Sequence, residues 1–182
     1  MKKLLVLSSL LATVATSAFA NISVNGFTFG NGGANGAVFF DTVGGTPADA
    51  TVKVDFLFGA SSGSLTDASS VFTIQAGTGG FLNAGVINVT SSNVGGGPGF
   101  YVMRAWTGGA TYDDIANTKK GTSGAATAIT FGGTPLLGGT PLGVPDLNLH
   151  ASFAITSVVV PEPATLALGL FGVAGLLARR RK

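Results

Sequence analysis

The chain has 182 residues, with 10 Lys plus Arg against 8 Asp plus Glu, so its formal net charge is +2. The basic residues gather at the two ends, whereas residues 21–160 hold seven Asp against four Lys and Arg. The alkaline pI of 9.2 therefore reflects the ends, and we expect no nucleic-acid partner. The absence of Cys and the single His exclude disulfides, a Cys nucleophile and His-cluster metal sites, so we expect no metal and no cofactor.

Residues 1–20 have the pattern of a secretory signal peptide. Lys2 and Lys3 precede a largely apolar run over residues 4–15. Ala18-Phe19-Ala20 then forms a small-x-small cleavage site, in which Ala18 and Ala20 are the small residues. The sequence therefore predicts export and cleavage by signal peptidase after Ala20.

The last 23 residues, 160–182, combine three features in a fixed order. A proline-rich motif comes first, then an apolar run over residues 166–178, then a basic cluster. At about 1.5 Å per helical residue this run spans roughly 20 Å, which is short of the roughly 30 Å hydrocarbon core. We predict a single transmembrane helix that stops briefly in the inner membrane with its cations in the cytoplasm. The motif is Val160, Pro161, Glu162 and Pro163, and the stop-transfer residues are Arg179, Arg180, Arg181 and Lys182.

This tail resembles the PEP-CTERM sorting signal of Gram-negative bacteria that make exopolysaccharide. The resemblance implies recognition by an exosortase, a membrane-embedded transpeptidase-like protease that cleaves near the motif. It implies an inner-membrane-anchored precursor whose body then moves to the cell surface or the extracellular matrix. Prolines keep the motif extended beside the membrane, which suits a protease substrate. The alternative is an ordinary proline-containing linker before a permanent anchor.

The body, residues 21–159, alternates apolar and polar residues in short segments separated by Gly, Asn and Ser clusters. The clearest strands are 51–58 and 100–106, and a long last strand has Leu147, Leu149, Ala151, Phe153 and Ile155 on one face. Weaker strands are expected at 22–29, 37–43, 71–76, 86–90 and 126–131. The apolar parity switches at Asn25-Gly26, which indicates a bulge or a tight turn. We predict an all-β ectodomain, an antiparallel β-sandwich or jelly roll.

Few residues of the body offer catalytic chemistry. His150, the only neutral-pH base, has the opposite parity to Leu149 and Phe153, which predicts a solvent-side or edge position. Asp113 and Asp114 follow Tyr112 in a turn, and together with Asn117 they offer oxygen ligands for calcium. Their spacing matches no EF-hand loop, so capping or turn formation by the Asp residues is favoured over calcium binding. We therefore expect no enzymatic activity.

Three aromatic residues, Tyr101, Trp106 and Tyr112, are candidates for a sugar-stacking platform, although aromatics on a β face more often belong to a core. Arg104 either pairs with a buried Asp or points outward. The block 101–112 with 121–123 is similar to strand-turn-strand blocks of bacterial surface proteins with PEP-CTERM tails, and names no activity. The favoured function is a structural component associated with exopolysaccharide or biofilm. A carbohydrate- or calcium-binding lectin-like surface module is the alternative, and a secreted hydrolase is a weaker one.

Overall fold

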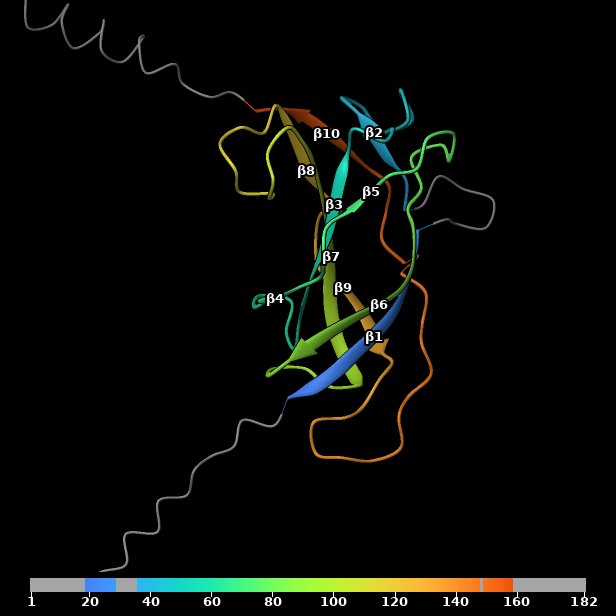
Figure 1. The fold of residues 1–182 in the computed structure, drawn as a ribbon, viewed down its shortest axis with the longest axis vertical. Helices are drawn as coiled ribbons and strands as arrows, with labels where there is room; N and C mark the ends of the chain where they lie inside the picture. The colour runs from blue at the N-terminus through green and yellow to red at the C-terminus, as the bar shows by residue number, and fades with distance from the viewer. Residues whose placement is uncertain (1–18, 29–35, 148, 159–182) are drawn as a thin grey trace, which may run out of the picture.

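The computed structural model describes residues 19–28, 36–147 and 149–158, and it contains only strands and loops within those ranges (Figure 1). The predicted all-β class is therefore confirmed for the described residues. The strands are β1 (Ala20–Phe27), β2 (Val38–Phe40), β3 (Lys53–Gly59), β4 (Asp67–Ala68), β5 (Phe72–Thr73), β6 (Asn83–Ser91), β7 (Gly97–Thr107), β8 (Lys119–Thr122), β9 (Thr127–Phe131) and β10 (Phe153–Ser157).

The strands form a two-stranded sheet, β1-β6, and an eight-stranded sheet of order β2-β10-β8-β7-β3-β4, in which β5 also pairs with β3 and β9 with β7. Neighbouring strands are antiparallel except β2 and β10, which run parallel with Val38 opposite Phe153. The expected purely antiparallel arrangement is thus corrected to a mixed one. β2 and β10 come from opposite ends of the body, so no hairpin dictates their relative direction.

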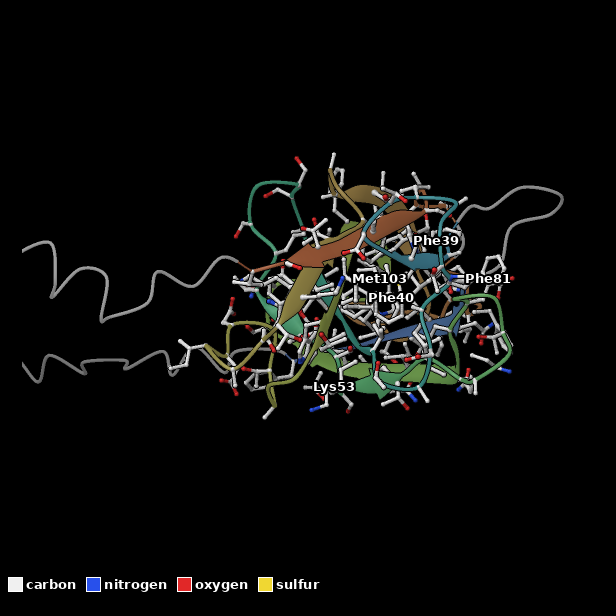
Figure 2. All side chains as sticks on the ribbon, turned by 90° about the horizontal axis from the view of Figure 1, so that it is seen from above. Phe39, Phe40, Lys53, Phe81 and Met103 are labelled. Carbon is white, nitrogen blue, oxygen red and sulfur yellow. The ribbon has the colours of Figure 1, made fainter. Side chains whose placement is uncertain are left out.

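The two sheets share one hydrophobic core. Ile22 of β1 and Ile87 of β6 belong to the same buried cluster as Phe56 of β3 and Met103 of β7. Figure 1 shows β1 and β6 crossing in front of β7 and β9, and Figure 2 shows Met103 in the middle of the domain. Burying each such side chain contributes about 1.5–3 kcal/mol, so this shared cluster is what holds the layers together.

The clearest predicted strands are confirmed as β3 and β7. Val54, Phe56 and Phe58 of β3 are 0% exposed, as their common parity predicted. The parity switch in β1 is a bulge, because the register with β6 shifts between Asn25 and Phe27. A Cβ on Gly26 would lie 2.7 Å from the Cβ of Ala84, so this bulge has room only for glycine.

The predicted long last strand is wrong in its first half. β10 begins at Phe153, and Leu149 is 62% exposed. Asn25 donates to Pro145 O at 2.7 Å and accepts from Leu147 N at 3.0 Å, so residues 145–147 are tied to β1 of the small sheet. The chain then crosses to the large sheet, where β10 begins. A single continuous strand could not pair with both sheets, so the predicted strand is interrupted.

β4 and β8 were not predicted, because neither alternates apolar and polar residues. β8 has the sequence Lys-Lys-Gly-Thr and forms between β7 and β10, with Ala105 opposite Gly121 and Thr156 opposite Lys120. Its strand conformation is imposed by the two neighbours on either side.

Candidate functional site: the sorting segment and the clusters of the body

The predicted sorting segment follows directly on the last strand of the domain. β10 ends at Ser157, and Val158 N donates to Thr118 O at 3.0 Å. β10 lies inside the large sheet, between β2 and β8. The described body therefore reaches Val158, two residues before the predicted motif begins at Val160. Figure 1 places the end of β10 and the start of β1 at opposite ends of the long axis.

Most of the predicted sorting residues lie outside the described residues. These are Ala18 of the cleavage site, the motif Val160, Pro161, Glu162 and Pro163, the predicted transmembrane helix, and Arg179, Arg180, Arg181 and Lys182. Ala20 is described: it is 4% exposed and pairs with Ser91 at the start of β1. The Ala20–Asn21 bond thus lies in a paired strand.

A buried ion pair occupies the outer face of β3 and β7. Asp55 lies opposite Arg104 in register, and the Arg104 Nε donates to Asp55 Oδ1 at 2.7 Å, while Nη2 donates to Oδ2. Asp55 is 5% exposed. Burial opposes the charge on Arg104, but the hydrogen bond and the attraction to Asp55 raise its pKa above the usual value. Of the two placements left open for Arg104, the buried pair is the one observed.

The loop over residues 108–118 folds across this outer face. Trp106 Nε1 and Lys53 Nζ both donate to Gly109 O, at 3.1 and 2.7 Å. Asn117 Oδ1 accepts from Gly109 N at 3.0 Å, and its Nδ2 donates to Thr111 O at 3.0 Å and Tyr112 O at 2.7 Å. Asn117 therefore holds the loop closed, a role that sequence reasoning missed because Asn is common in loops.

Asp114 closes the turn within this loop. Its carboxylate accepts from Ala110 N at 3.0 Å and Ala116 N at 2.9 Å, and these backbone bonds lower its pKa. The predicted turn-forming role is confirmed for Asp114. Asp113 instead points to Arg104, with 3.7 Å between Asp113 Oδ2 and Arg104 Nη1. In the described part of the chain, no three His, Asp or Glu residues lie together as metal ligands.

The predicted aromatic platform is corrected by burial. Tyr101 and Trp106 are 0% exposed, so neither offers a face for stacking on a sugar. The Tyr112 ring meets Trp106 edge-on, with centroids 6.1 Å apart, and the Arg104 Cζ lies 4.9 Å from its centroid. β7 is covered on one face by the core and on the other by the loop over residues 108–118. Because both faces of β7 are covered, the alternation of its residues alone does not predict which aromatic side chains are exposed.

His150 is also placed differently from its prediction. It is 2% exposed, and its Nδ1 lies 3.0 Å from the Tyr101 hydroxyl. Its strand parity does not apply, because residues 149–152 lie outside β10. Burial lowers the pKa of His150 to about 4 and raises that of Tyr101 to about 12, so both are neutral at pH 7. Within the described ranges no carboxylate or Ser/Thr hydroxyl bonds to this imidazole, so it has no triad partner there.

One hollow of 550 Å³ lies on the surface of the body. Its walls are Ala60, Pro98, Gly99, Phe100, Ala128, Ile129, Thr130, Pro145 and Leu149, none of which is titratable. The hollow therefore brings no acid or base to a bound molecule. Across residues 19–28, 36–147 and 149–158, no helix has the length and apolarity needed to span a membrane.

The body is thus an all-β domain joined at its last strand to a short terminal segment. That segment, residues 159–182, matches the family model of the PEP-CTERM protein-sorting motif. The chain carries this motif, as its residues predicted, and the motif implies an exported protein of Gram-negative bacteria that an exosortase processes. No curated protein and no solved structure matches the chain.

Proposed function

We propose that this chain is a non-enzymatic structural protein of the cell surface or extracellular matrix, associated with exopolysaccharide or biofilm. The observation that carries the proposal is the PEP-CTERM motif at residues 159–182, which follows directly on β10, the last strand of the folded body. In the sequence, only Val158 and Val159 separate the end of β10 at Ser157 from the motif residue Val160.

The proposed route has three steps. Signal peptidase removes residues 1–20 before β1 pairs with β6. Residues 166–178 then hold the precursor in the inner membrane, with the basic cluster on the cytoplasmic side. Exosortase cuts near Pro161 and Pro163, and the body, residues 21–159, moves outward as one domain.

A structural role for the body is supported by how its polar clusters are used. Arg104 and Asp55 neutralise each other, Asp114 closes a turn, and His150 is buried against Tyr101. Exposed Thr and Ser hydroxyls on a surface with few charges suit a hydrated polysaccharide, because they hydrogen-bond sugars without displacing counterions. A lectin-like role would need an exposed aromatic platform or a carboxylate cluster, and the burial of Tyr101 and Trp106 gives it no support.

The test replaces the motif and follows the location of the body. In the variant Pro161→Ala/Glu162→Ala/Pro163→Ala we expect the protein to stay in the inner membrane with its domain folded. Pro141→Ala, in an exposed loop, is the matched control and should be released normally. Fluorescence of Trp106, the only Trp, reports folding of both variants. Unchanged release of the triple variant would contradict the proposal.

A further inference from the structure

β6 has an inner edge, which faces β1, and an outer edge, which faces away from β1. The two edges differ in the hydrogen bonding of their backbone groups. Ser23 of β1 donates to Gly132 O at 2.8 Å and accepts from Gly132 N at 2.9 Å, and Asn25 bonds in the same way to Pro145 and Leu147. These β1 residues therefore turn their backbone groups away from β6. Their register partners on β6 are Asn88 and Val86, which must likewise turn their N–H and C=O groups away from β1. By the same alternation the backbone N–H and C=O groups of Thr90 also point away from β1.

No described strand covers this outer edge. Among the described residues β6 pairs with β1 alone, and Val86 is 56% exposed. Contacts at the two ends, from Gln75 to Asn83 and from Ser91 to Asp67, leave the middle of the strand open. The outer edges of β1 and β2 are closed by comparison, because Gly132 bonds to Ser23 and Thr46 bonds to Phe40.

The sequence of β6 lacks the usual protection of an open edge. Natural sheets block exposed edges with charges, Pro or very short strands. β6 has nine residues, Asn-Ala-Gly-Val-Ile-Asn-Val-Thr-Ser, with no charge and no Pro, and four of the five residues from Val86 to Thr90 are β-branched. A strand with these properties is a template for another strand.

We propose that two copies of this chain pair antiparallel through the outer edges of β6, centred on Asn88. In this register Asn88 lies opposite Asn88 of the second copy, and Val86 lies opposite Thr90. All three outward-facing residues then find a partner, whereas a shift by two residues leaves one of them unpaired. Because β6 carries no charge, self-pairing places no like charges opposite each other.

The proposed edge pairing matches the two copies on both faces of the sheet. The pairing keeps Ile87 and Val89, which are 3% and 8% exposed, on the core side of both copies, and Asn88 and Thr90 on the solvent side. It joins the two small sheets into one four-stranded sheet, β1-β6-β6-β1. The interface is isologous and closes as a twofold dimer.

The edge is accessible in a chain attached through its C-terminus. Figure 1 shows β1 and β6 toward one end of the long axis and the end of β10 at the other. The pairing thus does not depend on whether exosortase has removed residues 160–182. The sorting proposal and the dimer proposal can therefore fail independently, and the experiments distinguish the two failures.

Introduced cysteines test the pairing, since the natural chain has none. Residues that face each other in a hydrogen-bonded antiparallel pair have Cα atoms about 5.5 Å apart, within the range of a disulfide. In the full chain in detergent, Asn88→Cys should form a covalent dimer on mild oxidation. Val86→Cys is the matched control, because it faces Thr90 and not itself, and it should cross-link at least about tenfold more slowly. Equal cross-linking of the two variants, or none, would overturn the proposal.

Charge exchange tests the register independently. Val86→Lys/Thr90→Lys and Val86→Glu/Thr90→Glu each place like charges opposite each other, so each should sediment as a monomer. An equal mixture of the two should return to the dimer mass, because Lys then faces Glu at both positions. Val43→Lys/Leu137→Lys, at sites 58% and 100% exposed, adds the same charge elsewhere and should stay dimeric. A monomeric parent protein, or a mixture that stays monomeric, would contradict self-pairing.

Discussion

Asp55 on β3 and Arg104 on β7 lie opposite each other and join through two parallel N–H···O bonds. Their side chains are only 7% and 15% exposed. A slip of one residue between β3 and β7 would leave both charges without their partner, in addition to moving the core face outward. The pair therefore specifies the register of the two longest neighbouring strands of the large sheet.

Removing Asp55 should strongly destabilise the fold. Asp55→Ala leaves the Arg104 guanidinium partly buried without its main partner, and such losses cost about 3–5 kcal/mol. Asp113→Ala is the matched control. Asp113 is 81% exposed and 3.7 Å from Arg104, so its loss should cost less than about 1 kcal/mol. Urea unfolding followed by Trp106 fluorescence measures both, and equal small effects would contradict the structural role of the pair.

Asn117 should control the exposure of Trp106. Asn117→Ala removes three hydrogen bonds that hold the loop over residues 108–118, at a cost of roughly 1–3 kcal/mol. The loop then opens, so Trp106 emission should shift to the red and acrylamide quenching should increase. Thr111→Ala is the control, because Thr111 contributes only its backbone carbonyl to this network. Identical spectra for the two variants would show that the loop does not depend on Asn117.

The stability of the body should depend on pH through His150. Burial lowers the pKa of His150 from 6.5 to about 4, so the unfolded chain takes up a proton at higher pH than the folded chain. The contribution of His150 to the free energy of unfolding is fully present above about pH 6.5, and it is lost as the pH falls toward 4. A pKa shift of this size corresponds to about 3 kcal/mol.

The variant His150→Asn isolates this effect, because Asn keeps a polar group near the Tyr101 hydroxyl and does not titrate. Its free energy of unfolding should change less between pH 7 and pH 4 than that of the parent. Parallel pH profiles for the two proteins would assign the acid sensitivity to other groups.

Alternation was a reliable guide where one strand face met the core. Val54, Phe56 and Phe58 share a parity and are all buried, and the switch near Gly26 is a real bulge. It was unreliable where tertiary structure determined the conformation. The segment at 145–147 bonds to β1, β8 forms between two neighbours without any apolar pattern, and β2 meets β10 in parallel.

The sorting motif could be read from the sequence because it is linear: a proline motif, an apolar run and basic residues act in order along an extended chain. The clusters of the body could not, because their members come together only in the fold. Asp55 and Arg104 are 49 residues apart, as are Tyr101 and His150. Nothing near any of these residues in the chain predicts its partner.

The most direct test of the proposed sorting is the intact mass of the protein recovered separately from culture medium and from membranes. We expect a released species that begins at Asn21 and ends near Pro161 to Thr165. A membrane species that still carries residues 166–182, with no processed form released, would mean a permanent anchor and would contradict exosortase processing.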